Sequence, residues 1–406
     1  MKLVDIVSLI PEYELSIWDV IDEIKKILET WQVSCIKPIE KRVVNKDLVV
    51  YWALKRLDTK YVPVCEEQEE TEVSLEDLGF YDNIIGDQTR VFYNVVDAIA
   101  RSGPTPLVKL EDFSTHKVRV WAKLEWYWPC SLSLKDRIAY HMVKDLQSRG
   151  LTNGKILIDA SSGNFAVSLR ALSRWFGYNT RIYAPARPGR FGKYSKLFLE
   201  LTKTEIVPMD VGTTVEAISR VLEEGAKESN VVIASQLTND MNFEAHLKTM
   251  AKEIDFQAKA HNLNLVAIAG PLGTSGHMAA LNFYFRSKFK GKVKTIMAQP
   301  AKDDHIPGIR RVETGMKWLE AIGEDYTIID VTSLEAMRYL EKLAESDGIL
   351  PGPTSGAALA ALMKYLESSE GKKLEGDAVV VFPDHGFKYI EWIETKLKSL
   401  RGEENQ

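Results

Sequence analysis

The chain has 406 residues, of which 45% are hydrophobic and 27% are charged, and its formal net charge is −5. This is the composition of a globular protein long enough for about two domains, and it excludes a disordered, collagen-like or coiled-coil chain. The small acidic surplus also argues against nucleic-acid binding as the main task, because no basic excess is available to hold a polyanion.

The sequence gives no sign of membrane insertion or secretion. No apolar run approaches the ~20 residues that cross a bilayer. The N-terminus, MKLVDIVSLIPEYEL, lacks a small-residue cleavage site. Cys35, Cys65 and Cys130 are far apart and form no CxxC pair, which argues against a disulfide framework and against a zinc site. We therefore expect a soluble, cytoplasmic enzyme without a metal.

Residues 1–95 form the first predicted unit, a small helical N-terminal extension. Apolar residues recur at helical spacing from Ile17 to Trp31, and a second apolar segment runs from Asp47 to Leu57. The region contains no cluster of reactive side chains. We therefore expect its apolar helix faces to pack on the main body or on a partner subunit.

In the main body, residues 96–406, short β-branched runs alternate with helical patterns. Strands are expected at 118–124, 156–158, 181–184, 205–207, 231–234, 265–269, 295–298 and 378–382, and helices at 135–147, 166–176, 193–201, 215–228 and 357–366. This alternation predicts an α/β protein whose parallel sheets are covered on both faces. Ligands bind such sheets at the carboxyl ends of strands, so the turns that follow the strands are the places to look for chemistry.

Three turns before helices combine glycine with hydroxyl side chains. The turn from Gly270 to His277, GPLGTSGH, offers small residues, hydroxyls and a helix N-terminus, which together suit a phosphate. It lacks the P-loop lysine and a GxGxxG pattern, which disfavours a nucleoside triphosphate and a dinucleotide. The turn from Asp159 to Phe165, DASSGNF, suits a carboxylate, and GPTSG at 352–356 precedes a third helix. The simpler alternative is that these hydroxyls only cap helices.

Lys135 lies in SLSLKDR at a predicted loop-to-helix junction. A lysine at such a junction is usually a surface charge. A phosphate site, a carboxylate loop and a hydroxyl-bearing turn follow it in order, however, and this combination fits an amine that binds the aldehyde of a phosphorylated cofactor.

The ordered motifs SLSLKDR, SSGNF, GPLGTSGH and GPTSGAA resemble those of the β-family, or fold type II, of pyridoxal-phosphate enzymes. This family includes cysteine synthases and cystathionine β-synthase, and the resemblance covers roughly residues 100–395. It implies two parallel-sheet α/β domains around a central cleft, with a smaller subdomain at about residues 136–240 inserted in the larger one. It also implies pyridoxal 5′-phosphate as the cofactor.

The resemblance implies a role for each motif. Lys135 would hold the cofactor covalently and act as the catalytic base. The other cofactor-binding groups would be Asn164 at the ring hydroxyl, Thr354 or Ser355 at the pyridine nitrogen, and Gly273, Thr274, Ser275, Gly276 and His277 at the phosphate. The substrate carboxylate would be held by Ser161, Ser162, Asn164, the Phe165 N–H and Gln236.

A further segment, IPGIRRVETGM at residues 306–316, places arginines where acetylserine enzymes keep small residues. Together with EAH at 244–246 and PDHGFKY at 383–389, it resembles the O-phosphoserine sulfhydrylases. By this resemblance Arg310 would bind the leaving phosphate through bidentate hydrogen bonds. The alternative for Arg310 and Arg311 is a surface ion pair with Glu313.

We therefore predict a homodimeric, pyridoxal-phosphate-dependent transferase of cysteine biosynthesis. It would make L-cysteine from sulfide and O-phospho-L-serine, with O-acetyl-L-serine as a second candidate substrate. Two alternatives stay open: a cystathionine β-synthase acting on serine and homocysteine, and a catalytically silent homologue acting as a binding protein. The presence of Lys135 argues against the silent homologue. The sequence does not decide between Thr354 and Ser355 at the pyridine nitrogen.

Overall fold

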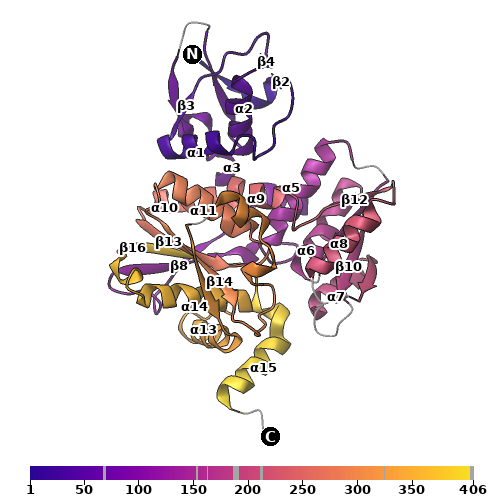
Figure 1. Cartoon of the computed structure of the whole chain (residues 1–406), viewed down its shortest axis with the longest axis vertical. Helices are drawn as coiled ribbons and strands as arrows, with labels where there is room; N and C mark the ends of the chain where they lie inside the picture. Colours follow the sequence, from indigo (N-terminus) through magenta and orange to yellow (C-terminus); the bar gives the residue numbers. More distant parts are fainter. Residues whose placement is uncertain are drawn as a thin grey trace.

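The structure is a computed structural model of the chain and describes residues 1–66, 70–151, 154–161, 163–185, 192–210, 214–323 and 325–402. Figure 1 shows an N-terminal unit in indigo at one end, a large sheet with its helices in the centre, and a smaller sheet at its side. Among the described residues, no helix combines the length and the apolar character needed to cross a bilayer.

The large sheet has six strands in the order β15-β14-β13-β16-β8-β7. The strands are β7 (Leu107–Leu110), β8 (Val118–Leu124), β13 (Leu265–Pro271), β14 (Lys294–Pro300), β15 (Thr327–Val331) and β16 (Gly376–Phe382). All neighbours are parallel except β7, which runs antiparallel to β8. No strand was expected from the sequence at the positions of β7 and β15.

Helices cover both faces of this sheet. Ala267 and Ala269 of β13 pack into one core with α14 (Pro353–Glu367), next to α13 (Ser333–Ser346). Ile268, between them, packs into the other core with α11 (Gly276–Lys288). Since alternate residues of a strand point to opposite faces, burial on both faces explains why this strand appears in the sequence as one continuous apolar run.

The smaller sheet has four parallel strands in the order β11-β10-β9-β12. The strands are β9 (Ile156–Ala160), β10 (Asn179–Pro185), β11 (Glu205–Met209) and β12 (Val231–Ile233), and the accompanying helices are α5 (Lys135–Ser148), α6 (Asn164–Ser173), α7 (Lys193–Leu201) and α8 (Thr214–Gly225). Further α-helices are α3 (Asp82–Ile85), α4 (Val95–Arg101), α9 (Met241–His246), α10 (Lys252–Ala260), α12 (Lys317–Ile322) and α15 (Ile390–Arg401). Two parallel-rich sheets confirm the predicted α/β fold class.

The N-terminal unit is a mixed α/β structure, so the expectation of a helical extension is wrong in this respect. The paired strands are β1 (Lys2–Asp5) with β5 (Tyr61–Val64), β2 (Ile10–Pro11) with β4 (Arg42–Val43), and β3 (Gln32–Ser34) with β6 (Glu72–Ser74). The two apolar segments of the sequence do form helices, α1 (Ile21–Thr30) and α2 (Asp47–Arg56). Strands of two to four residues are too short for their alternation to stand out.

A disulfide joins Cys35, which follows β3, to Cys65, which follows β5. The Cys65 N–H donates to the Ile36 carbonyl at 3.0 Å, so the two segments lie side by side. The argument from cysteine spacing against a disulfide is therefore wrong for this pair. A separation of 30 residues gives no indication that the two segments meet. Cys130 is free and buried.

Buried charges fasten the N-terminal unit to the main body. Arg56 at the end of α2 forms an ion pair of 3.3 Å with Glu244 on α9. The Lys252 ammonium, on α10, donates to the Leu57 carbonyl at 3.1 Å. Because an unpaired buried charge is costly, these contacts stabilise the packing of the N-terminal unit against the main body. The unit thus packs on the main body, one of the two arrangements that the sequence suggested.

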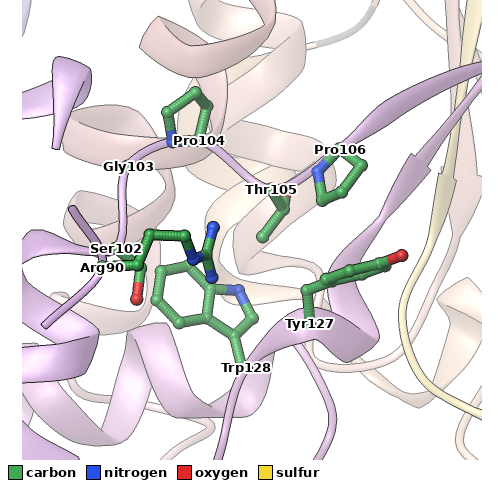
Figure 2. A pocket seen from close by; sticks show the side chains of 8 residues that line it. All are labelled: Arg90, Ser102, Gly103, Pro104, Thr105, Pro106, Tyr127 and Trp128. Atoms are coloured by element: carbon green, nitrogen blue, oxygen red, sulfur yellow. The ribbon is translucent and has the colours of Figure 1, made fainter. Parts of the chain in front are cut away.

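A small pocket lies where the segment before β7 passes the loop after β8 (Figure 2). Its lining residues are Arg90, Ser102, Gly103, Pro104, Thr105, Pro106, Tyr127 and Trp128. None of the site residues expected from the sequence lines this pocket, although Thr105 and Trp128 donate hydrogen bonds to buried Glu125 at 2.7 and 3.1 Å.

Candidate active site

The loop before Lys135 is held by a buried carboxylate. Asp136 accepts hydrogen bonds from the backbone N–H groups of Cys130 and Ser131 at 2.8 and 3.0 Å. It also accepts from the Ser168 hydroxyl on α6 at 2.6 Å. Lys135 is the first residue of α5, and the loop that precedes it is held in place by the next residue, Asp136.

The Lys135 amine is set up to be partly neutral. Burial lowers its pKa to about 8, with the Arg310 charge acting in the same direction and Asp384 opposing. Within the described residues no hydrogen-bond acceptor meets this amine, whereas its backbone N–H donates to the Ser133 hydroxyl at 3.2 Å. A lysine amine that is partly neutral near physiological pH and has no fixed partner is suited to act as a nucleophile or a base.

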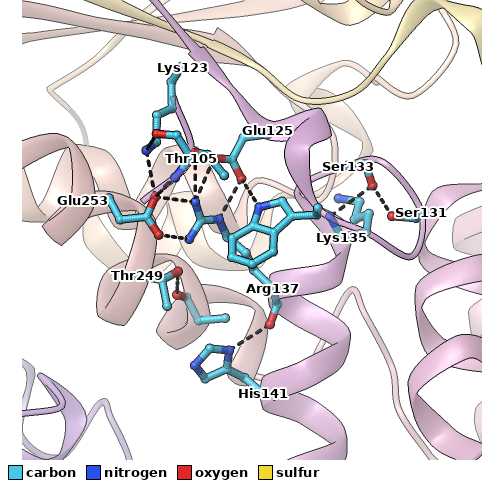
Figure 3. Close-up of polar contacts among 12 residues, drawn as sticks. Thr105, Lys123, Glu125, Ser131, Ser133, Lys135, Arg137, His141, Thr249 and Glu253 are labelled. Carbon is cyan, nitrogen blue, oxygen red and sulfur yellow. Dashed lines mark hydrogen bonds and ion pairs between the residues drawn. The ribbon is translucent and has the colours of Figure 1, made fainter. Parts of the chain in front are cut away.

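An ionic network lies behind the loop that leads to Lys135 (Figure 3). Arg137 bonds Glu125 at 2.7 Å and Glu253 at 2.5 Å, and Lys123 bonds Glu253 at 2.7 Å. All four side chains are at most 4% exposed. This network fixes α5 against β8 and α10. Sequence analysis missed it because its members are up to 130 residues apart.

The turn after β13 has the geometry of an anion cup. Ser275 adopts a left-handed backbone conformation, φ 76°, which non-glycine residues rarely adopt outside strained or functional turns. Asn242 fixes the turn by donating to the Thr274 hydroxyl at 2.9 Å, and it lies so close to Gly276 that a Cβ there would collide with it. The Ser275 hydroxyl is buried and has no hydrogen-bond partner among the described residues.

His277 is the second residue of α11, next to this turn, and faces a second buried histidine. Its ring centroid is 5.7 Å from that of His246, and none of the four ring nitrogens has a hydrogen-bond partner in the described part of the chain. Burial, assisted by the Lys135 charge, lowers the pKa of His277 to about 3, so the ring is neutral. A neutral ring still carries one N–H donor for an anion.

The turn after β9 is only partly available to a carboxylate. The Ser161 hydroxyl already accepts a hydrogen bond from the Ala166 N–H at 3.1 Å and so caps α6. The Phe165 N–H lies in the first turn of α6 and has no acceptor within the helix. Ser162 lies outside the described residues. The backbone N–H groups of this turn are therefore better placed to bind a carboxylate than the Ser161 hydroxyl, which already takes part in a hydrogen bond.

Gln236 lies at the edge of the same turn. Its side-chain amide donates to the Ala160 carbonyl at 3.0 Å, and its backbone carbonyl accepts from the Asn242 side chain at 2.7 Å. Since Asn242 also holds Thr274, one buried residue links the carboxylate turn to the anion cup. Asn242 was not singled out in the sequence, because nothing in its local pattern indicates these contacts.

The side chain of Asn164 meets a group of residues that follows β16. It donates to Asp384 at 2.6 Å, and its oxygen accepts from Lys388 at 2.8 Å. The Tyr389 hydroxyl donates to the same Asp384 oxygen at 2.5 Å. The resemblance had singled out the motif PDHGFKY without giving its residues a role. The structure places three of them against Asn164.

Buried polar atoms without partners test whether a phosphorylated pyridine aldehyde fits here. Thr354 and Ser355, in the first turn of α14, are 4% and 0% exposed, and neither hydroxyl has a partner among the described residues. One oxygen of Asp384 is likewise unpartnered. Such groups are costly unless a ligand bonds them. Hydroxyls at α14, the cup at α11 and the Lys135 amine match the ring, phosphate and aldehyde of pyridoxal phosphate.

Arg310 and Arg311 differ in their partners. Arg310 donates through Nε to the Gly273 carbonyl at 2.8 Å and through Nη1 to the Thr314 hydroxyl at 3.0 Å, and no carboxylate contacts it within the described residues. The expected alternative of an Arg310–Glu313 pair is wrong. Arg311 forms that pair, at 2.9 Å, and contacts Asp330 as well. The Arg310 guanidinium thus lies on the rim of the anion cup with its charge unpaired.

Comparisons with known proteins agree with this geometry. The family model described as pyridoxal-phosphate dependent enzyme matches residues 100–384. Cysteine synthase of Aquifex aeolicus is 32% identical over 299 residues, which cover 71% of this chain and 88% of that protein. Cystathionine beta-synthase of Saccharomyces cerevisiae is 28% identical over 334 residues, which cover 74% and 64%. A hydrogen sulfide-producing enzyme from Fusobacterium nucleatum matches with a TM-score of 0.64 at 25% identity, over 74% of this chain and all of that one.

These matches confirm the predicted family, the fold and the dependence on pyridoxal phosphate. The family match covers the strands and turns that carry the candidate site, and it ends at Asp384. The N-terminal unit lies outside it. This chain therefore belongs to the family of pyridoxal-phosphate dependent enzymes, as a β-replacement enzyme of the cysteine synthase and cystathionine β-synthase type.

Proposed function

We propose that this enzyme makes L-cysteine from O-phospho-L-serine and sulfide. The observation that carries the proposal is the unpaired Arg310 guanidinium beside Gly273. A phosphate dianion is costly to desolvate unless a cation meets it, and a planar guanidinium meets it in a bidentate manner. An acetyl leaving group has no such requirement.

Each group of site residues has its own step in the proposed reaction. Lys135 removes the α-proton of the substrate, which its lowered pKa supports. The turn after β9, with Ser161, Ser162, the Phe165 N–H and Gln236, holds the substrate carboxylate. Arg310 binds the leaving phosphate, and hydrosulfide takes its place at the β-carbon. When bound, pyridoxal phosphate supplies the electron sink that makes the α-proton acidic.

Cofactor contacts come from three helix starts. We assign the ring hydroxyl to Asn164, the pyridine nitrogen to Thr354 or Ser355, and the phosphate to the cup at Gly273, Thr274, Ser275, Gly276 and His277. The orphaned buried hydroxyls of Ser275, Thr354 and Ser355 support these assignments. We further propose that the enzyme is a homodimer in the cytoplasm, and mass measurement of the full chain in solution tests the dimer.

The test of the leaving group is a comparison of kcat/KM for phosphoserine, acetylserine and serine with sulfide as the acceptor. We expect phosphoserine to be the best substrate. A higher kcat/KM for acetylserine than for phosphoserine would contradict the proposal. The assignment as a β-replacement enzyme would stand, because sulfide adds to the same β-carbon whichever group has left.

A second candidate is the cystathionine β-synthase reaction, because relatives with that name match the chain. One of them, the O-acetylserine dependent cystathionine beta-synthase of Bacillus subtilis, is 28% identical over 312 residues, which cover 96% of its length. Replacing sulfide by homocysteine as the acceptor distinguishes the two reactions. Faster turnover with homocysteine than with sulfide would favour the second candidate.

A further inference from the structure

Lys388 is a second buried lysine at the candidate site, and nothing in the proposed reaction uses it. It lies on the short turn Gly386–Tyr389 that follows β16. Its side chain is only 5% exposed. A lysine in such a position needs several hydrogen-bond acceptors to offset its lost hydration.

Three acceptors surround the Lys388 ammonium. It donates to the Asn164 side-chain oxygen at 2.8 Å, to the Ser131 carbonyl at 2.9 Å and to the Leu132 carbonyl at 3.1 Å. Asp384 lies at 3.5 Å and balances the charge. Lys388 thus joins the loop before Lys135 to the start of α6 and to the end of β16.

One of these acceptors belongs to a strained residue. Leu132 has a positive φ of 52°, a conformation that a leucine rarely adopts. Such a conformation persists only where its surroundings hold it. The Lys388 contact to the Leu132 carbonyl is therefore one of the constraints on the loop that carries Lys135.

The contacts also fix the orientation of the Asn164 amide. An ammonium only donates, so the amide oxygen must face Lys388 and the NH2 group must face Asp384. That NH2 group has two hydrogens, and Asp384 takes one of them. The second meets the Tyr389 hydroxyl only at 3.4 Å, a long contact, so a closer acceptor in the site, such as the ring hydroxyl oxygen of the cofactor, can take it.

We propose that Lys388 is a positioning residue of the cofactor site, which orients the Asn164 amide toward the ring hydroxyl of pyridoxal phosphate. This rests on the proposed role of Asn164. Lys388 does not compete with Lys135 for the cofactor aldehyde, because its three N–H donors already have three acceptors. The Lys135 amine has none among the described residues.

The test is cofactor affinity, with a matched control. Lys388→Met removes the ammonium and keeps the side-chain length. Lys252→Met does the same at another buried lysine, which donates to the Leu57 and Asp58 carbonyls away from the site. The dissociation constant for pyridoxal phosphate is measured by titrating each apo-protein and following the visible absorbance of the bound cofactor. Thermal unfolding of each apo-protein is recorded alongside.

We expect both variants to melt earlier than the wild type. Only Lys388→Met should weaken cofactor binding, by ~10-fold or more, which corresponds to ~1.4 kcal/mol. Equal weakening in Lys252→Met, or unchanged affinity in Lys388→Met, would overturn the proposal. If Lys388→Met does not fold, Lys388→Gln is measured in the same way, with the same two outcomes.

A double-mutant cycle tests the route through Asn164. If Lys388 acts through that amide, Asn164→Ala with Lys388→Met should bind the cofactor no more weakly than Asn164→Ala alone. The proposal would be overturned if the two losses of cofactor affinity multiply in the double variant. It would also be overturned if Asn164→Ala alone bound the cofactor as tightly as the wild type. A wild type that binds the cofactor and prefers acetylserine would instead refute the phosphoserine assignment and leave the role of Lys388 standing.

Discussion

Arg310→Ala should reduce activity with phosphoserine and spare activity with acetylserine. The guanidinium has five N–H donors. Nε is used by the Gly273 carbonyl and Nη1 by Thr314, and Nη2 has no partner among the described residues. Nη2 can therefore give the phosphate at least one charge-assisted hydrogen bond, of a kind typically worth ~1.5–3 kcal/mol. At ~1.4 kcal/mol per tenfold, kcat/KM for phosphoserine should fall by about 10- to 100-fold.

The assay is steady-state cysteine formation from each substrate with sulfide and saturating cofactor. Arg311→Ala is the matched control, since that side chain pairs with Glu313 and Asp330. We expect Arg311→Ala to change kcat/KM for both substrates in the same proportion. The reasoning is refuted if Arg310→Ala lowers both substrates equally, or if Arg311→Ala shows the same selective loss of phosphoserine.

Three other outcomes are expected. Cofactor uptake by the apo-protein should accelerate as pH rises through about 8, where Lys135 loses its proton, and level off above; stopped-flow absorbance measures this, and an inflection near the ordinary lysine pKa would contradict it. Arg137→Ala should lower the free energy of unfolding by ~3–5 kcal/mol, since buried Glu125 loses its ion-pair partner and Glu253 keeps only Lys123; urea denaturation checks it. Replacing Cys35 and Cys65 by serine should cost ~3–4 kcal/mol for a loop of this length, and reductant should bring the wild type to the same melting temperature.

The parts of the site that sequence could predict are local. Lys135, Asn164 and the cup at Gly273–His277 each lie where a loop or strand turns into a helix, and at Asn164 and the cup glycine and hydroxyl residues follow one another directly. A backbone that must approach a ligand needs these residue types at consecutive positions. These parts of the site can therefore be recognised from short motifs. The parallel strands that precede them can likewise be recognised from short segments of the sequence.

What the sequence could not show depends on contacts between distant segments. Asp384 and Lys388 meet Asn164 across more than two hundred residues. The Cys35–Cys65 bridge and the very short strands of the N-terminal unit have no periodic pattern either. Which of Arg310 and Arg311 pairs with Glu313 was decided only by geometry, because the two residues are adjacent and chemically identical.

The ion pair between Arg56 and Glu244 has a consequence for how such enzymes can change over time. Glu244 is 2% exposed and is also bound by Lys248 at 3.0 Å. A chain of this fold without the N-terminal unit would leave this charged helix face uncovered, whereas Arg56 would still have Glu14 of its own unit at 2.9 Å. The face of α9 therefore depends on the unit more than Arg56 depends on α9, and a chimaera that combines the two from different sources should exchange both together.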